Sequence, residues 1–210
     1  MALPALDALD LASLMASKIC HDVVGPVGAC VNALETLDEE DGGDMAEFAM
    51  NVVRDSSAVA ADKLAFARTA FGATGGATTP IDSGLAEEVA QGLYKHEKAE
   101  LKWSGPRSMM PKDRAKVLLG LVYQAKEAVP RGGTVDVAIE GEGDAATFTV
   151  RGSGPRARIP DAIADLIDGR FDGAISAREV QPWFTLKLAE ACAMDVRVKP
   201  DGDDVVFTAA

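Results

Sequence analysis

The stretch that decides the fold is KICHDVVGPVGA, residues 18–29, in which a histidine stands beside an aspartate and a proline follows five residues later. Apolar residues recur around it at steps of three and four over about 8–37, which predicts one long helix with a single apolar seam. A proline inside a helix removes one backbone hydrogen bond and either bends or ends the helix. His21 is therefore either an ordinary surface histidine on a helix that Pro26 ends, or a chemically active one on a helix that Pro26 only bends.

A second helix is expected to pair with the first. The turn DEEDGGD, residues 38–44, is followed by an apolar seam over about 45–71. Two long helices with a short connection form an antiparallel hairpin. A lone hairpin leaves apolar surface exposed, and two copies forming a four-helix bundle would bury it, so a homodimer is expected.

The remainder of the chain has a different pattern. After a Gly/Thr-rich linker at 72–80, short helices and strands alternate. Helices are expected at about 83–96, 112–129, 161–167 and 183–193, and strands at about 100–103, 134–139, 145–151, 196–198 and 205–208. This mixture favours an α+β sandwich, with helices packed on one face of a mixed sheet. We therefore expect a helical hairpin domain at 1–75 and an α/β sandwich domain at 76–210.

Composition narrows the class of protein. The 210 residues carry a formal net charge of −12 and are 48% hydrophobic, which predicts a soluble globular protein with a substantial core. The negative charge argues against nucleic acid and anionic membranes as partners. The N-terminus has no basic segment of the kind that opens a signal peptide, and no apolar run approaches a membrane span. No membrane association is expected.

The cysteines and histidines argue against a metal site. Cys20, Cys30 and Cys192 form no CxxC pair, and the chain holds two histidines, neither in a ligand spacing with a cysteine pair. The three thiols are interpreted as buried side chains in a reducing cytoplasm. A cytoplasmic protein without a metal of its own is expected.

The helical repeat predicts where His21 points. At about 100° per residue, His21 lies roughly 165° from the direction of the apolar seam, so it should face solvent. Lys18, Asp22, Gly25 and Gly28 share its broad side. The two glycines either tolerate the bend at the proline or leave the helix surface bare, so that another protein can approach the imidazole.

The chemistry of these side chains suits phosphoryl transfer. Near neutral pH an imidazole is often a neutral nucleophile, and its nitrogen can accept a phosphoryl group and release it. Asp22 could orient the ring or act as a base, or it could be an ordinary solvated carboxylate. Lys18 could balance phosphoryl charge, or it could be an ordinary surface lysine.

Two segments resemble motifs of sensor histidine kinases. His21-Asp22-x-x-x-Pro26 is similar to their H-box, H-[ED]-x-x-x-P, on the first helix of the dimerisation and phosphotransfer hairpin. The stretch VLLGLVYQAKEAVPRGG, residues 117–133, aligns without gaps with their N-box, V-L-x-N-L-x-x-N-A-x-K-x-x-P-x-G-G. The resemblance implies a four-helix bundle in the dimer, followed by a nucleotide-binding sandwich of the GHKL (Bergerat) type.

The nucleotide-binding motifs have lost their functional residues. Gly120 and Gln124 stand where the N-box asparagines belong, the second of which is the Mg²⁺ ligand in the kinases, and Glu127 replaces the lysine. In VRGSG, residues 150–154, Val150 replaces the aspartate that reads adenine in D-x-G-x-G. No Gly-rich G-x-G-L-G box follows. The resemblance therefore implies a degenerate ATPase-like domain that does not bind ATP.

A kinase-like hairpin joined to a degenerate ATPase-like domain resembles the dimeric ChpT-type histidine phosphotransferases of alphaproteobacteria, over essentially the whole chain. The resemblance implies that His21 is phosphorylated by the receiver aspartate of a CckA-like hybrid histidine kinase. It passes the phosphoryl group to CtrA-like and CpdR-like response-regulator receivers that control the cell cycle. The receiver supplies Mg²⁺, so no cofactor of its own is implied.

The receiver-docking surface is expected beside His21. Antiparallel pairing places His21 level with about residue 61 and Gly28 level with about Arg54, and the angular count points Arg54 and Arg68 to the same broad side. Together with Lys18 they are candidate electrostatic guides for an acidic receiver pocket, or simply solvated charges.

Three further residues complete the expected docking side. Val24 and Val31 lie on its flank and belong either to the bundle core or to a docking patch. Gly25 stands where bifunctional kinases often carry the threonine or asparagine that places a hydrolytic water, so weak phosphatase activity is expected.

Two other functions remain open on the sequence. One is an ATP-dependent histidine kinase with unusual motifs, which ATP binding would reveal. The other is a non-catalytic module that binds receivers, in which His21 is incidental. A His21→Ala variant that still supports its pathway would favour that module.

Overall fold

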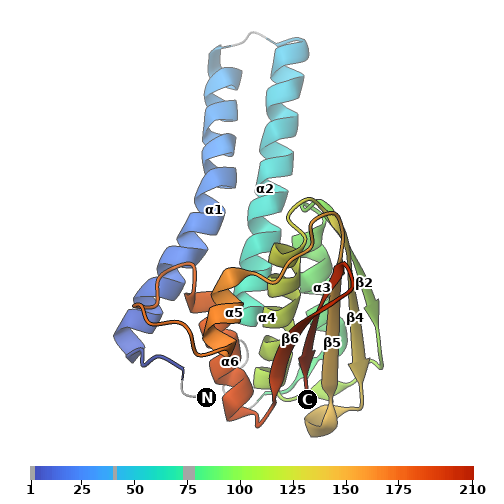
Figure 1. The fold of residues 1–210 in the computed structure, drawn as a ribbon. Coiled ribbons are helices and arrows are strands. Elements are labelled where there is room, and N and C mark those ends of the chain that lie inside the picture. The colour runs from blue at the N-terminus through green and yellow to red at the C-terminus, as the bar shows by residue number, and fades with distance from the viewer. Residues whose placement is uncertain (1–2, 40–41, 73–78) are drawn as a thin grey trace.

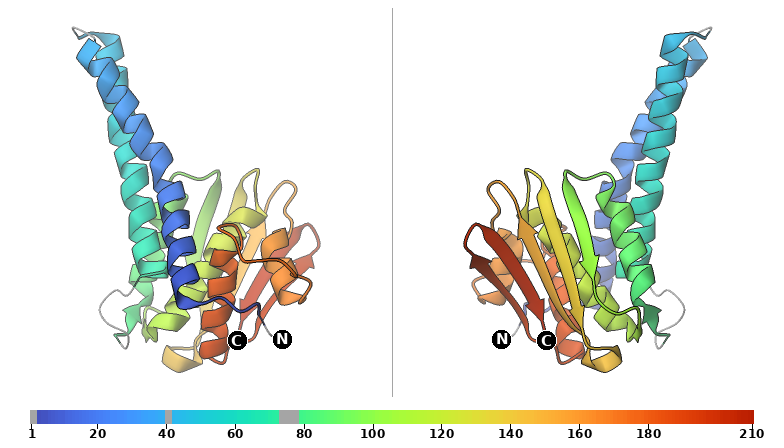
Figure 2. Two further views of the ribbon diagram at one scale, coloured as in Figure 1. Left: turned by 90° about the vertical axis from the view of Figure 1, so that its left-hand side faces the viewer. Right: turned by 90° about the vertical axis from the view of Figure 1, so that its right-hand side faces the viewer.

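The computed structural model describes residues 3–39, 42–72 and 79–210. A long helical hairpin stands on one side of a sheet that is covered by helices, and the upper half of the hairpin projects away from the rest (Figure 1). The two side views show the same projection, with both ends of the chain near the foot of the molecule (Figure 2). The expected turn at 38–44 and linker at 72–80 lie partly outside the described residues.

The hairpin consists of α1 (Ala8–Glu39) and α2 (Asp44–Ala70), close to the expected bounds. Pro26 lies inside α1, so the helix continues past it. The expected register is closely matched: the Cys30 thiol lies 3.6 Å from the carbonyl oxygen of Val53. Pro26 therefore does not end the helix, and His21 lies in the interior of a continuous helix.

The C-terminal part is a sheet with helices on one face. Its five-stranded sheet has the order β2-β4-β5-β7-β6, with β2 parallel to β4 and the other neighbours antiparallel. The elements are β1 (Ile81–Asp82), α3 (Ser83–Tyr94), β2 (Ala99–Ser104), β3 (Met109–Met110), α4 (Lys112–Ala128), β4 (Gly133–Glu140), η1 (Gly143–Ala145), β5 (Thr147–Ser153), α5 (Asp161–Ile167), α6 (Val180–Ala191), β6 (Val196–Asp201) and β7 (Asp204–Ala209). The predicted hairpin followed by an α/β sandwich is therefore confirmed. The short pair β1–β3 was not predicted.

The core of the sandwich lies around α4. Its side chains Leu118, Leu121 and Val122 are completely buried between the sheet and the other helices. Phe66 and Ala70, at the end of α2, belong to the same buried cluster. The foot of the hairpin is therefore packed into the core of the sandwich.

A second apolar cluster fixes the start of α1. Leu6 and Leu11 pack against a buried cluster that includes Trp183 and Leu186 on α6. The indole nitrogen of Trp183 donates a hydrogen bond of 2.9 Å to the carbonyl oxygen of Pro4. Both helices of the hairpin are thus anchored to the C-terminal part, which sets the position of His21 relative to it.

Apolar side chains remain exposed on the upper hairpin. Val24 is 67% exposed, Val31 is 49% exposed and Phe48 is 64% exposed. Among the described helices, α1 is long and apolar enough to cross a membrane by length and composition alone. The expectation that no run would approach a membrane span was therefore wrong, because α1 carries apolar residues for α2 and also on faces that α2 leaves open.

Candidate functional site

His21 lies on an open part of α1. Its side chain is 85% exposed, as the angular argument predicted. A Cβ atom built at Gly25 or at Gly28 would meet nothing within 4 Å. The helix surface next to the imidazole is therefore bare, which allows a large partner to come close to the ring.

Asp22 lies between His21 and Lys18. Its Oδ1 atom is 3.5 Å from His21 Nδ1, the long end of hydrogen-bond distance. Its Oδ2 atom accepts a hydrogen bond of 2.6 Å from the Lys18 ammonium. The carboxylate can therefore favour a proton on Nδ1, which leaves the lone pair of Nε2 for a nucleophilic role.

The backbone of Asp22 has a partner on α2. Proline lacks an N–H group, so Pro26 cannot donate to the carbonyl four residues earlier in the helix, which is that of Asp22. Lys63 Nζ donates to this carbonyl oxygen at 3.1 Å. A cation on α2 thus replaces the missing helix hydrogen bond next to His21. The sequence signal was present, since the expected register places residue 63 within about a turn of Asp22.

Lys18 is turned toward the C-terminal domain rather than to solvent. Its side chain is 14% exposed, and its Nζ atom donates at 2.7 Å to the hydroxyl oxygen of Tyr123 on α4. Burial lowers the pKa of Lys18, but the Tyr123 and Asp22 oxygens outweigh this effect and the net pKa is raised. The lysine thus bridges the two domains, which differs from the expected free electrostatic guide.

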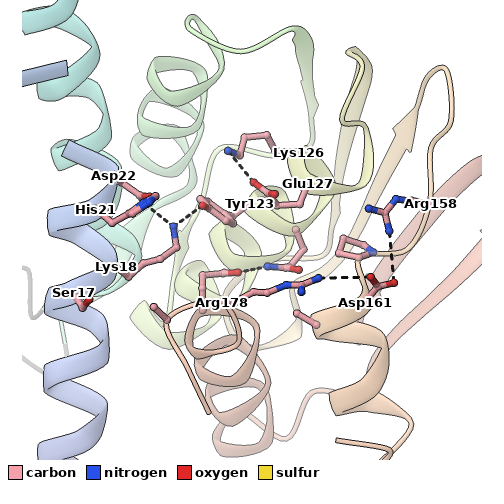
Figure 3. A pocket seen from close by; sticks show the side chains of 15 residues that line it. Ser17, Lys18, His21, Asp22, Tyr123, Lys126, Glu127, Arg158, Asp161 and Arg178 are labelled. Atoms are coloured by element: carbon pink, nitrogen blue, oxygen red, sulfur yellow. Dashed lines mark hydrogen bonds and ion pairs between the residues drawn. The ribbon is translucent and has the colours of Figure 1, made fainter. Parts of the chain in front are cut away.

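A cleft of about 570 Å³ opens beside His21. Figure 3 shows His21 and Asp22 on α1 facing side chains of α4 and of the segments that lie between β5 and β6 in the chain. Charged groups of both signs line it, and Arg158 and Arg178 each lie 3.6 Å from Asp161. These arginines come from segments distant in sequence, so periodicity gave no sign of them.

Tyr123 is bracketed by two lysines. The ammonium of Lys18 lies 4.9 Å from the ring centroid, and that of Lys126 lies 4.7 Å from it. Lys126 also pairs with Glu127 at 3.0 Å and Glu97 at 3.3 Å. Burial lowers the pKa of Lys126, but Tyr123 and the two carboxylates raise it well above its ordinary value. The tyrosine is thus fixed on its own domain.

The residues that align with the nucleotide-binding motifs of the kinases make contacts within the protein, and Gln124 also lines the cleft beside His21. Gln124 donates to the side-chain oxygen of Gln181 on α6, and Gln181 Nε2 lies 3.3 Å from the carbonyl oxygen of Gly120. A Cβ atom at Gly120 would collide with the side chain of Thr185. Val150 is completely buried on β5. Glycine, glutamine and valine thus stand at the three positions that align with motif residues of the kinases.

The other predicted site residues are more scattered. Arg54 is exposed and donates at 3.1 Å to Asn51, and the exposed Arg68 lies near the foot of α2. Neither lines the cleft beside His21. The structure therefore does not bring Lys18, Arg54 and Arg68 together as one cationic surface.

The solvent exposure of the three cysteine thiols differs from the expectation. Cys20 is exposed, and Cys30 and Cys192 are partly buried, so the prediction of three buried thiols was wrong. Cys20 precedes His21 on an open helix, whereas Cys30 faces α2. Among the described residues, no three histidine, cysteine, aspartate or glutamate side chains gather in a way that could hold a metal ion.

Comparison with known proteins identifies the family. The family of the histidine phosphotransferase C-terminal domain matches residues 84–204. Protein phosphotransferase ChpT of Brucella abortus (strain 2308) is 41% identical over 211 residues, covering all of both chains. The solved structure of a bacterial phosphotransferase is 39% identical, with a TM-score of 0.92 over both full chains. A histidine kinase, AdeS of Acinetobacter baumannii, matches 90% of this chain and 95% of its own at 14% identity and a TM-score of 0.46. The chain with the exposed His21 therefore belongs to the ChpT-type family of histidine phosphotransferases.

Proposed function

We propose that His21 is the residue that carries the phosphoryl group of this phosphotransferase, between the receiver aspartate of a hybrid histidine kinase and those of response regulators. The exposed imidazole beside Asp22, on a bare helix face that opens onto a cleft, is the observation that supports this most strongly. Receivers of the CckA-like donor type and of the CtrA-like and CpdR-like acceptor types are the proposed partners.

The transfer step follows from the geometry of the ring. With the proton on Nδ1 facing Asp22, the Nε2 lone pair attacks the phosphorus of the aspartyl phosphate. The bond between phosphorus and the carboxyl oxygen breaks, and its electrons remain on the departing carboxylate. The reverse step delivers the group to the next receiver. Because the transition state is loose, in-line positioning and charge neutralisation are the main requirements. The Mg²⁺ of the receiver would neutralise that charge.

We propose further that the protein does not use ATP. Restoring a kinase-like asparagine at Gly120 would require space that Thr185 occupies, and Gln124 is engaged with Gln181. This packing favours a relay intermediary over an ATP-dependent kinase. Gly25 leaves no side chain to place a hydrolytic water, which favours relay of the phosphoryl group over its loss.

We propose a cytoplasmic homodimer. The residues Val24, Val27, Val31 and Leu34 are spaced at three and four along α1, and each is at least 47% exposed. Such a stripe is typical of a bundle seam. Val24 and Val31 are therefore assigned to the bundle core rather than to a receiver-docking patch.

Mass spectrometry of the intact protein tests the role of His21. After incubation with a phosphorylated receiver, the wild type should gain one phosphoryl group that is labile to acid and stable to alkali. The His21→Ala variant should gain none and should still bind the receiver, because the bare helix face is unchanged. A phosphorylated His21→Ala protein would contradict the assignment. Binding without phosphorylation of the wild type would favour the non-catalytic module.

A further inference from the structure

We propose that Tyr123, on α4 of the C-terminal domain, is a positioning residue that orients the His21–Asp22 pair through Lys18. The inference rests on the proposed function of His21. It gives the C-terminal domain a direct part in the chemistry of the hairpin.

One ammonium group links the two domains. Lys18 Nζ lies 2.6 Å from Asp22 Oδ2 on its own helix and 2.7 Å from the Tyr123 hydroxyl oxygen on α4. An ammonium has three donors, and taking it out of water is unfavourable unless those donors find acceptors. The 14% exposed Lys18 side chain is therefore held at one place by two acceptors.

Fixing Lys18 also fixes the carboxylate. Asp22 Oδ2 faces the lysine, which leaves Oδ1 directed toward His21 Nδ1 at 3.5 Å. A carboxylate beside one ring nitrogen favours the tautomer that carries its proton there. Without the phenol oxygen, Lys18 would keep its pairing within α1 and its contact with the face of the ring, and would lose its only hydrogen-bond acceptor on α4 among those described. Pairs within one helix are weak and mobile when they are exposed.

The position of the Tyr123 side chain does not depend on Lys18. Its ring packs 6.1 Å from that of Phe66, measured between centroids, and the Lys126 ammonium lies 4.7 Å from its centroid. Removal of the hydroxyl alone therefore leaves the ring in place. Tyr123→Phe is thus a clean perturbation of the link to α1.

Ring-nitrogen NMR tests the positioning directly. The chain has two histidines, so the signals of His21 and His96 can be assigned by single substitutions. In Tyr123→Phe, the fraction of His21 with the proton on Nδ1 should fall, while His96, which pairs with Asp62 at 2.9 Å, should not change. Tyr94→Phe removes another tyrosine hydroxyl from the same domain, bonded to the Val122 carbonyl, and should leave His21 unchanged. Unchanged His21 nitrogens in Tyr123→Phe would overturn the proposal.

Transfer kinetics separate positioning from receiver contact. At saturating phosphorylated receiver, Tyr123→Phe should lower the first-order rate by about tenfold, the scale of one hydrogen bond to a charged group. The receiver concentration for half-maximal rate should stay the same. In a Lys18→Met background the substitution should have no further effect, because the link is already broken. An effect on affinity alone, or an equal effect in both backgrounds, would refute the role. No label on wild-type His21 would instead overturn the proposed function.

Discussion

Lys63→Met tests whether a cation on α2 replaces the helix hydrogen bond that Pro26 removes. The substitution keeps a long apolar side chain and deletes the donor that lies 3.1 Å from the carbonyl oxygen of Asp22. A hydrogen bond from a charged donor contributes about 1.5–3 kcal/mol. Because Lys63 is only partly buried, we expect the lower end, a loss of about 1.5 kcal/mol in the free energy of unfolding.

A double-mutant cycle with Pro26→Ala isolates this contact. Alanine restores an N–H group at residue 26, which can donate to the Asp22 carbonyl, so Lys63→Met should then cost almost nothing. Urea unfolding at one fixed protein concentration measures all four proteins, since association would otherwise shift the midpoint. Lys63→Arg, which keeps a donor, serves as the control. An equal cost of Lys63→Met in both backgrounds would refute the compensation.

Three further outcomes follow from packing and charge. Gly120→Asn should destabilise the protein by about 1–3 kcal/mol, because its side chain meets Thr185. Calorimetry should detect no ATP binding, and a stable variant that binds ATP would contradict the proposal that the protein does not use ATP. Phe48→Glu places a charge on the exposed apolar hairpin and should convert the dimer to a monomer in light scattering, whereas an unchanged dimer mass would place the seam elsewhere. Burial, followed by Glu97 and Glu127, raises the pKa of Tyr94 well above its ordinary value of 10.0. The stability that the neutral phenol contributes to the folded state is therefore complete below pH 10.0 and is lost as the pH rises from there through the raised pKa. The free energy of unfolding should therefore fall less with alkaline pH in Tyr94→Phe than in the wild type. The same dependence on pH in both proteins would argue against this.

The helices were the most predictable part of the fold, because their apolar periods extend over many residues. The short β1 and β3 carry two residues each, too few for any period to show. The start of α6 was placed three residues late, at Trp183 instead of Val180. Pro182 lies in the first turn of α6, where a proline is tolerated because its missing N–H has no helix partner to lose.

The site was predictable only where it depends on one helix. The exposure of His21 and the bare surface at Gly25 follow from angles along α1. The role of Lys18 did not, because its second partner, Tyr123, lies 105 residues away in sequence and meets it only through the packing of α4 against the hairpin. Long-range side-chain contacts leave no periodic signal in either segment.

The most direct test of the account is a relay between two receivers. A donor receiver carrying a labelled aspartyl phosphate is mixed with a second receiver, either alone, with this protein, or with His21→Ala, and a parallel series contains labelled ATP in place of the donor. We predict that label reaches the second receiver rapidly with the wild type and not with His21→Ala, and that ATP labels neither protein. Rapid relay by His21→Ala, or labelling of His21 from ATP, would contradict the central claim that His21 transfers phosphoryl groups between receivers.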